Sequence, residues 1–479
     1  MPLRSGATFH FVFRAVLLLS GWVVALWLIS REPNPTAPPE VRPVVKALEE
    51  GKVARAFREW SEQEELAGAA IGFAVFDEAG KGVFTSPLGK TALCPASSLK
   101  TVTSATALSI LGPEFRFTTT LAGTTALNPE GLLEGDLVLV GGGDPTLNVE
   151  ELEELADTAV KAGLRKVSGQ LRVDTSIFPQ NPMSDFWNWG DIGNAYGAGA
   201  YGLNLEHNRM TITFDPGSEE GTPAQFVSGG PALRETLWEN QVMTGPEGSG
   251  DQVVVYSQPY GRKVTLRGTV PAGEKGFTVG GAIPDPPALA AELLRARLEK
   301  AGVTFTATAE PSPKAADQVL ARHESAPLPE IIDHLHRVSD NLETQCLFLT
   351  VGIRQKAKPA DAVRAHWEEA GIAFAGLRLL DGSGLARANV IRPVDLAMVN
   401  YRMRHGAHGD RFFASLSQYL DGAVRAKRGA MSGVKTEVGF LRTAAGHEWT
   451  FALMANGLRP GLDFWPYRTE LLAAVQEGN

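Results

Sequence analysis

The chain has 479 residues, enough for about three domains of ordinary size. Its 44% hydrophobic and 21% charged residues can supply a sizeable core, which excludes a disordered polymer. The net charge of −9 argues against a nucleic-acid backbone as the main partner, and two cysteines are too few for a disulfide scaffold or a structural zinc cluster.

The first segment has the pattern of an export signal. Arg4 and Arg14 precede Ala15–Ile29, a nearly unbroken apolar run, and an extended Pro-rich stretch follows, which disfavours a buried core helix. Leu28-Ile29-Ser30 lacks the small residues of a cleavage site, so a cleaved signal peptide and a retained signal anchor both stay open. We expect residues 1–31 to be this leader and residues 32–41 to be a linker. The protein is expected in the periplasm or cell envelope, free or anchored to the cytoplasmic membrane.

The next segment alternates helix and strand. Val41–Leu66 is mostly helical in its apolar spacing. The apolar runs Ala69–Phe76 and Gly82–Ser86 flank a turn and predict a β-hairpin. A helix is expected to open at Pro95 and to end near Leu111, before a Gly-Pro pair.

From about residue 115 the pattern becomes mostly β, with turns rich in Gly and Pro. One clear helix is expected at Val149–Ala162. The expected strands are Phe117–Leu121, Asp136–Val140, Gln170–Val173, Met210–Phe214, Val253–Tyr256 and Val264–Val270. This stretch is typical of one or two inserted modules.

The last third returns to an α/β pattern. Helical periodicity covers Pro287–Ala301 and Leu328–Val351. A hairpin is expected from Val434–Arg442 and Glu448–Ala455, followed by a helix over Thr469–Gln476. The first and last thirds therefore share a pattern that the middle interrupts.

Ser97 and Lys100 form a Ser-x-x-Lys pair at the start of a predicted helix. Residues three apart share a helix face, about 5–6 Å apart at Cβ. A serine hydroxyl needs a base within hydrogen-bond reach, and a lysine can be that base if its pKa is lowered by burial or a nearby cation. Ser98 lies in the wrong register for this. A Ser-x-x-Lys pair is weak evidence alone and needs partners.

Two further elements follow in order. Ser339-Asp340-Asn341 supplies a Ser-x-Asn element, and Gly422–Gly429 contains a lysine two residues before its last glycine. The trio resembles the active-site serine penicillin-recognising enzymes, whose signatures are Ser-x-x-Lys, Ser-x-Asn and Lys-Thr/Ser-Gly.

The 242 residues between Ser97 and Ser339 are too many for a loop inside one domain. With this insertion, the chain resembles the D-alanyl-D-alanine carboxypeptidase/endopeptidase family, the class C low-molecular-mass penicillin-binding proteins. Further matching segments are Pro95-Ala96-Ser97, Val140–Leu147, Ser339–Leu342, Leu380–Leu385 and Gly422–Gly429. The resemblance covers essentially everything after the linker.

The resemblance implies an α/β penicillin-binding domain, similar to serine β-lactamases, with a large mostly β insertion between the first two active-site motifs. We expect residues 42–114 and 313–479 to build that domain in two or three layers. Residues 115–312 are expected to form the insertion, as two nested modules.

The third motif has two candidates. Lys435-Thr436 matches its first two positions, but Glu437 stands where the family has glycine. The order of the family's strand and the following turn is better satisfied by Lys427-Arg428-Gly429-Ala430, with Lys435-Thr436 on the next strand. We therefore expect Lys427 to be the motif lysine.

The resemblance also implies roles and an activity. Ser97 would attack the carbonyl between two D-alanines, and Lys100 would take its proton with a pKa lowered partly by Lys427. Ser339 would relay the proton to the leaving amine, and Asn341 would hold the substrate amide. Backbone N–H groups of Ser97 and Ala430 would form the oxyanion hole. No metal or organic cofactor is implied.

The strand departs from the family where hydroxyl side chains hold the terminal carboxylate of the substrate. Arg428 and Ala430 occupy those positions, around Gly429. Arg428 would either grip the carboxylate through charge-assisted hydrogen bonds or crowd the cleft. The first alternative predicts an active carboxypeptidase, and the second a catalytically weak protein that binds peptidoglycan.

The expected function is therefore a serine-type D-Ala-D-Ala carboxypeptidase, with cross-link endopeptidase activity as a possible addition and β-lactams as covalent inhibitors. A β-lactamase or esterase on a related scaffold is disfavoured because those enzymes lack such an insertion. The expected substrates are peptidoglycan peptides that end in D-Ala-D-Ala.

Three other features have structural interpretations. Asp333-His334 and His336 invite a metal site, but no third ligand lies nearby in the sequence, so surface or packing roles are favoured. Asp381–Gly384 is favoured as a turn beside the cleft. Cys94 and Cys346 flank two motifs of one cleft, and two separately buried thiols are favoured over a disulfide.

Overall fold

The computed structural model describes residues 51–307 and 315–477. The expected leader, residues 1–31, and linker, residues 32–41, lie outside the described residues. In the described ranges, none of the helices has the length and hydrophobicity needed to cross a membrane.

Strands from early and late parts of the chain build one sheet. Among the described residues it has six strands in the order β16-β17-β18-β19-β1-β2. Their bounds are β1 (Ala70–Phe76), β2 (Gly82–Thr85), β16 (Ser417–Tyr419), β17 (Val424–Met431), β18 (Val434–Arg442) and β19 (Glu448–Asn456). Both hairpins expected from the sequence are antiparallel pairs, β1–β2 and β18–β19. The two hairpins join through β1 and β19, with Ala70 opposite Asn456.

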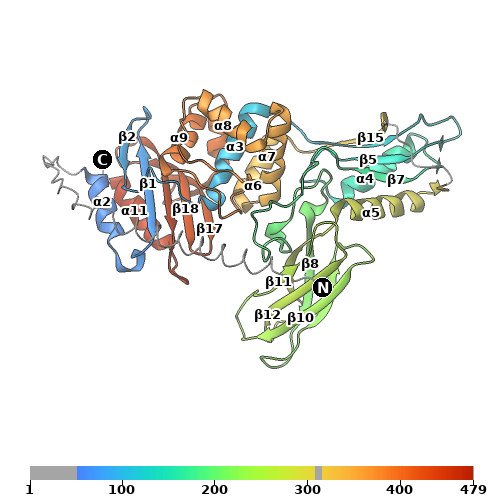
Figure 1. Ribbon diagram of the computed structural model, residues 1–479, viewed down its shortest axis with the longest axis horizontal. Coiled ribbons are helices and arrows are strands. Elements are labelled where there is room, and N and C mark those ends of the chain that lie inside the picture. The colour runs from blue at the N-terminus through green and yellow to red at the C-terminus, as the bar shows by residue number, and fades with distance from the viewer. Residues whose placement is uncertain (1–50, 308–314, 478–479) are drawn as a thin grey trace, which may run out of the picture. The chain divides into compact units, whose positions relative to one another are not determined.

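Two helices cover one face of this sheet, α2 (Lys52–Ser61) and α11 (Trp465–Glu477) (Figure 1). Helix α2 buries Val53, Phe57 and Trp60, whose spacing places them on one side of the helix. They pack in one apolar cluster with residues of α11, among them Leu472, and with residues of the strands. This apolar layer covers the face of the sheet that lies away from the predicted site residues.

The other face is covered by a helical layer around α3 (Lys100–Leu111). Every residue of α3 from Lys100 to Leu108 is buried, so it is a core helix rather than an amphipathic one. The other helices of this layer are α6 (Leu328–Val338), α7 (Asn341–Gln355), α8 (Pro359–Glu369), α9 (Pro393–Arg404) and α10 (Gly409–Ala414). The apolar cluster of this layer includes Val102, Leu335, Leu347 and Leu396.

Between α3 and α6 the chain forms the β-rich insertion. Its sheets within the described residues are β15-β3-β5-β7, β14-β6-β4, β10-β12-β11 and β13-β8-β9. The first two sheets consist of β3 (Thr118–Gly123), β4 (Leu132–Leu133), β5 (Leu137–Val140), β6 (Lys166–Val167), β7 (Leu171–Asp174), β14 (Thr304–Phe305) and β15 (Gln318–Glu324). The other two consist of β8 (Arg209–Asp215), β9 (Gln225–Gly230), β10 (Leu237–Gly245), β11 (Val254–Tyr256), β12 (Lys263–Pro271) and β13 (Phe277–Ala282). Two helices, α4 (Val149–Lys161) and α5 (Pro286–Lys300), pack against each other beside the first sheet.

The insertion has its own apolar core and also contacts the helical layer. Strand β15 follows residue 312, the expected end of the insertion, yet pairs with β3. The sheet of the insertion therefore includes residues on both sides of that boundary. Phe178 and Ala200 of the insertion are buried in the same cluster as Leu335 and Leu347. The insertion thus packs directly on the helices that carry the second motif.

Candidate active site

The predicted nucleophile lies in a tight turn before α3. Ser97 belongs to a short 3₁₀ helix, η2 (Ala96–Leu99), and Ala96 before it has a left-handed backbone with φ of 45°. An alanine rarely adopts this conformation, and such backbone outliers cluster at functional sites. Ser98 points elsewhere, because its hydroxyl donates to the carbonyl of Pro95. The geometry matches the register expected for Ser97.

Lys100 is fully buried, and its Nζ has three oxygen partners. It donates to Ser97 Oγ at 2.9 Å, to Asn341 Oδ1 at 2.6 Å and to the carbonyl of Ser383 at 2.7 Å. Burial, and then the positive charge of Lys427, hold the pKa of the Lys100 amine well below its ordinary value. In the neutral amine, two N–H bonds can serve Asn341 and Ser383, which leaves the nitrogen lone pair facing the Ser97 hydroxyl.

The second motif breaks a helix that the sequence predicted as continuous. Helix α6 ends at Val338, and the next residue, Ser339, has a left-handed backbone with φ of 60°. Asp340 then caps α7, since its side chain accepts from the backbone N–H of Glu343. This break puts Ser339 and Asn341 at the junction of two helices, with both side chains directed to the site.

Asn341 connects the nucleophile to the insertion. Its Oδ1 accepts from Lys100, and its Nδ2 donates to the carbonyl of Tyr196 at 2.7 Å. Tyr196 belongs to a short 3₁₀ helix of the insertion, η3 (Ala195–Gly197). The insertion therefore contributes a backbone group to the polar network around Lys100.

Strand β17 supplies the third part of the site. Lys427 is buried, and its Nζ donates to Ser339 Oγ at 2.8 Å and to the carbonyl of Arg428 at 3.0 Å. Burial and the charge of Arg428 lower the pKa of Lys427 to about 8. Gly429 lies so close to the nucleophile turn that an added Cβ would be 2.8 Å from the backbone nitrogen of Ser97. The strand thus needs a glycine here to reach the serine backbone.

The alternative lysine lies on the neighbouring strand. Lys435 pairs with Ala430 across β17 and β18, and its Nζ is 5.5 Å from the ring centroid of Trp465. Thr436 is buried and donates its hydroxyl to the carbonyl of Pro95. Lys427, rather than Lys435, reaches the second motif.

Arg428 lies on the opposite side of β17 from Lys427, as alternation along a strand requires. Its guanidinium is 5.6 Å from the ring centroid of Trp465, the first residue of α11. Arg428 and Ala430 are both exposed. The arginine therefore does not separate Ser97 from Lys427, and an approaching anion can reach it.

Two backbone carbonyls of the site were not singled out from the sequence, although one of them lies in the Leu380–Leu385 segment that matched the family. The Ser383 carbonyl binds Lys100, and the Asp381 carboxylate organises that turn by accepting from the backbone N–H groups of Ser383 and Gly384. The segment is thus a turn beside the site, as favoured from the sequence. The Tyr196 and Ser383 contacts use backbone carbonyls, which any residue type provides.

The other features have distinct environments. His336 is buried between the hydroxyls of Ser104 and Ser415, and burial holds its pKa well below the ordinary value. Cys94 and Cys346 are buried free thiols, as favoured from the sequence. Away from Ser97, the described residues include one group that could hold a metal ion: His207, His334 and Glu343.

The arrangement can perform nucleophilic acyl transfer. A hydroxyl faces a buried amine with a lowered pKa, a second hydroxyl is held by a second lysine, and backbone N–H groups of the turn and the strand lie nearby. These are the parts needed to form and resolve a covalent acyl intermediate.

Comparisons with known proteins agree with this chemistry. Residues 53–463 match the D-Ala-D-Ala carboxypeptidase 3 (S13) family. A D-alanyl-D-alanine carboxypeptidase of Actinomadura sp. (strain R39) is 32% identical over 433 residues, covering 83% of this chain and 79% of that protein. The D-alanyl-D-alanine carboxypeptidase DacB of Haemophilus influenzae is 27% identical over 425 residues, covering 82% and 87%. The crystal structure of penicillin binding protein 4 from H. influenzae has a similar fold, with a TM-score of 0.74 at 23% identity over 88% of this chain and 98% of that one.

Proposed function

Since the chain belongs to the D-Ala-D-Ala carboxypeptidase 3 (S13) family, we propose that Ser97 is the nucleophile of this enzyme and Lys100 its general base. The chain is a serine-type D-Ala-D-Ala carboxypeptidase that acts on peptidoglycan. The α/β penicillin-binding fold with a β-rich insertion, expected from the sequence, is confirmed. The observation that carries the residue assignment is the 2.9 Å contact between the buried Lys100 Nζ and Ser97 Oγ.

Acylation begins when Ser97 Oγ attacks the carbonyl carbon between the two D-alanines, while Lys100 Nζ accepts the hydroxyl proton. The oxyanion forms beside the backbone N–H groups of Ser97 and Ala430, where such donors typically contribute a hundredfold or more in rate. Collapse breaks the C–N bond and leaves the shortened peptide as an ester on Ser97.

The leaving amine needs a proton, and Ser339 is placed to deliver it. Lys427 donates to Ser339 Oγ, so the positive charge of Lys427 makes that hydroxyl a better proton donor. We assign Ser339 as the relay: its hydroxyl protonates the amine of the departing D-alanine and takes back the proton that Lys100 removed from Ser97. Asn341 is assigned to hold the substrate amide. Water then hydrolyses the ester, and Ser97 regains its proton.

Arg428 is proposed to bind the terminal carboxylate of the substrate, in place of the hydroxyl side chains usual in the family. Its exposed guanidinium, beside Lys435 and the Trp465 ring, supplies positive charge at the edge of β17. Guanidinium binds carboxylates through paired, charge-assisted hydrogen bonds. Gly429 and Ala430 would line the same substrate site through their backbone.

Peptidoglycan lies in the cell envelope, and the enzyme acts there. We propose that residues 1–31 export the chain to the periplasm, either as a cleaved signal peptide or as an anchor in the cytoplasmic membrane. We further propose that β-lactams, which mimic the D-Ala-D-Ala carbonyl, acylate Ser97 covalently.

Labelling with a fluorescent penicillin, beside D-alanine release from a peptide ending in D-Ala-D-Ala, tests these assignments. The parent should label and release D-alanine, and Ser97→Ala should do neither. Ser109→Ala is the matched control, because Ser109 lies on α3 far from the Lys100 end, and it should behave as the parent does. Labelling that survives in Ser97→Ala would exclude Ser97 as the nucleophile.

The same experiment decides the role of Arg428. If Arg428 binds the carboxylate, the Arg428→Thr variant should still be labelled by penicillin. It should need a higher concentration of the peptide substrate to release D-alanine at the parent's rate. If Arg428 crowds the cleft, the parent should stay unlabelled while Arg428→Thr labels. Assaying a cross-linked peptide dimer alongside would measure the endopeptidase activity.

A further inference from the structure

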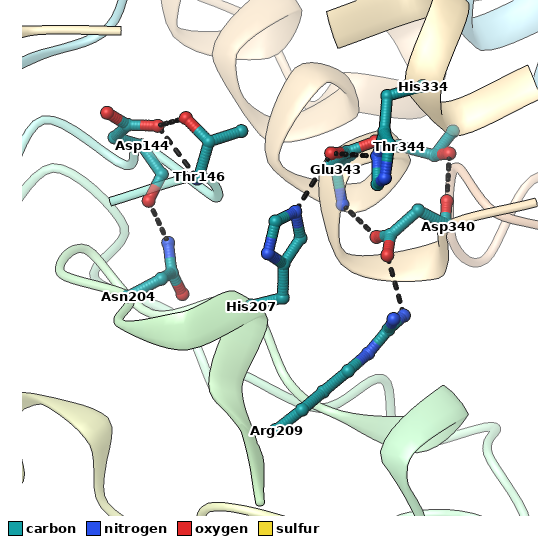
Figure 2. Close-up of polar contacts among 9 residues, drawn as sticks. All are labelled: Asp144, Thr146, Asn204, His207, Arg209, His334, Asp340, Glu343 and Thr344. Carbon is teal, nitrogen blue, oxygen red and sulfur yellow. Dashed lines mark hydrogen bonds and ion pairs between the residues drawn. The ribbon is translucent and has the colours of Figure 1, made fainter. Parts of the chain in front are cut away.

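A second cluster of chemistry-bearing side chains lies where the insertion meets the helical layer (Figure 2). His207 comes from η4 (Glu206–Asn208) of the insertion, His334 from α6, and Glu343 from the first turn of α7. Glu343 Oε1 contacts His334 Nδ1 at 2.7 Å and His207 Nε2 at 3.0 Å. The proposed catalytic residues do not include any of the three.

The carboxylate of Glu343 is unusual in its burial and in its partners. The side chain is 1% exposed, and both histidines contact one of its oxygens. The other oxygen, Oε2, is buried without a hydrogen-bond partner among the described residues. A buried carboxylate oxygen without a partner is costly, and a bound cation is one way to satisfy it.

The three side chains have the composition and spacing of a metal site. One ligand atom from each lies within 4.8 Å of the other two. A tetrahedral ion about 2.0–2.1 Å from its ligands holds them roughly 3.3 Å apart. Small rotations of the partly exposed imidazoles would adapt the present contacts of 2.7 and 3.0 Å to such an ion. Two imidazole nitrogens with one carboxylate oxygen suit zinc and similar transition metals, and are poor ligands for Mg²⁺ or Ca²⁺.

We propose that His207, His334 and Glu343 bind one divalent transition-metal ion of the zinc type, which fastens the insertion to the helices that carry Ser339 and Asn341. The side chains of His207 and His334 are 28% and 35% exposed, so a remaining coordination position can hold water. The ion is structural and takes no part in acyl transfer.

The surroundings of Glu343 support this arrangement. Asp340 Oδ1 accepts from the Glu343 backbone N–H, and Asp340 Oδ2 accepts from Arg209 of the insertion at 2.6 Å (Figure 2). Metal ligands are commonly held by such outer contacts. Glu343 follows His334 by nine residues, whereas His207 lies 136 residues before Glu343, so the sequence near His334 does not show the complete ligand set.

The test uses the full chain after removal of metals with a chelator. Zn²⁺ binding is measured by titration calorimetry, and the melting temperature is followed with and without Zn²⁺. We expect one Zn²⁺ per chain and a rise in melting temperature on binding. Mg²⁺ at the same concentration should give neither.

Variants distinguish this site from other histidines on the surface. His207→Ala and His334→Ala should each weaken Zn²⁺ binding at least tenfold and abolish the rise in melting temperature. His447→Ala is the matched control, because His447 also faces a carboxylate, that of Glu78, and it should bind as the parent does. If a variant fails to fold, visible absorption of bound Co²⁺ in the parent, of the intensity typical of four-coordinate nitrogen and oxygen ligands, still reports the site.

Absence of one-to-one binding in the parent would overturn the proposal. Binding that persists unchanged in both His207→Ala and His334→Ala would overturn it equally. Penicillin labelling of Ser97 is read in parallel. The proposed function predicts penicillin labelling without metal. A failure of Zn²⁺ binding would therefore leave the labelling result unaffected, and a failure of labelling would leave the Zn²⁺ result unaffected.

Discussion

At the scale of single residues, the site depends on two lysines in different protonation states. Lys100 is fully buried and has the more strongly lowered pKa, whereas Lys427 keeps a pKa of about 8. At neutral pH Lys427 is therefore largely charged, whereas the lowered pKa of Lys100 favours its neutral form. A neutral amine can accept the Ser97 proton, and a charged one can polarise Ser339. Burial lowers both pKa values, and the charge of Lys427 adds to the lowering at Lys100.

The protonation of Lys427 predicts how the rate constant for penicillin acylation changes at alkaline pH. As pH rises through about 8, Lys427 loses its proton, Ser339 loses its charged donor, and the rate constant for penicillin acylation should fall. Lys427→Arg keeps the charge, so the fall near pH 8 should disappear. The rate constant itself should drop about tenfold or more, because guanidinium does not replace an ammonium at a 2.8 Å contact.

Stopped-flow acylation between pH 6 and 10 measures the effect. Lys435→Arg is the matched control on the adjacent strand and should keep the parent's profile. A limb near pH 8 that persists in Lys427→Arg would assign it to another group.

At the scale of elements, strand β18 is tied to α11 through a buried ion pair. Glu437 and Arg468 are 1% and 5% exposed, and Nε of the arginine is 3.2 Å from a carboxylate oxygen. Burial raises the pKa of Glu437 from 4.5 to about 7, and Arg468 only partly opposes that rise. The folded protein therefore holds a proton that the unfolded chain releases between these two values.

Stability should consequently fall as pH rises from about 4.5 to 7, by up to about 3 kcal/mol from this group alone. Glu437→Gln cannot titrate, so its free energy of unfolding should change less over this window than that of the parent. Denaturant unfolding at pH 5 and pH 7.5 measures the difference. Glu247→Gln, at an exposed position of the insertion, should show the parent's pH dependence. An identical dependence in Glu437→Gln would exclude Glu437 as the source.

Elements with a strong local pattern were predictable from the sequence. Both hairpins, α4 and α5 were found within a few residues of their observed bounds, because alternating or helical spacing of apolar residues dictated them. The break between α6 and α7 was not found, since Ser339 adopts a left-handed backbone without glycine. Helices α8 and α9 were also missed.

The parts of the site that consist of side chains could be predicted from the sequence. The parts that consist of backbone groups could not. Ser97, Lys100, Ser339, Asn341 and Lys427 were chosen from motifs. In the fold Lys100 contacts Ser97 and Asn341, and Lys427 contacts Ser339. The turn that contains Ser383 was expected beside the cleft, but the contacts of the Tyr196 and Ser383 carbonyls could not be foreseen, because they depend on long-range packing.

At the scale of the whole molecule, the insertion contacts the proposed catalytic centre. The Tyr196 carbonyl accepts from Asn341, and Arg209 pairs with Asp340 between the two motif residues. Asp340 is buried, and it also caps α7. The insertion therefore helps to hold the Ser339–Asn341 turn in place.

Arg209→Met should leave Asp340 without its cationic partner and let this turn shift. We expect penicillin acylation to slow about tenfold, because small displacements of catalytic groups are costly. Arg262→Met is the matched control: it removes the cation paired with Asp285, which caps α5 inside the insertion, and acylation should be unchanged. Comparable rates in both variants would show that the insertion does not position the turn.

The pairing of β1 with β19 has a consequence for how the protein is made. Ala70 of β1 is paired with Asn456 of β19 in the sheet. Strand β1 therefore cannot complete this pairing until 386 further residues have been synthesised. At about 5–20 residues per second, that wait is about 20–80 s. For most of this time Ser97 has been synthesised, but Lys427 and the late strands of the sheet have not. An unfinished chain therefore carries the proposed nucleophile without the lysine and strands that complete its site, so acyl transfer requires the complete polypeptide.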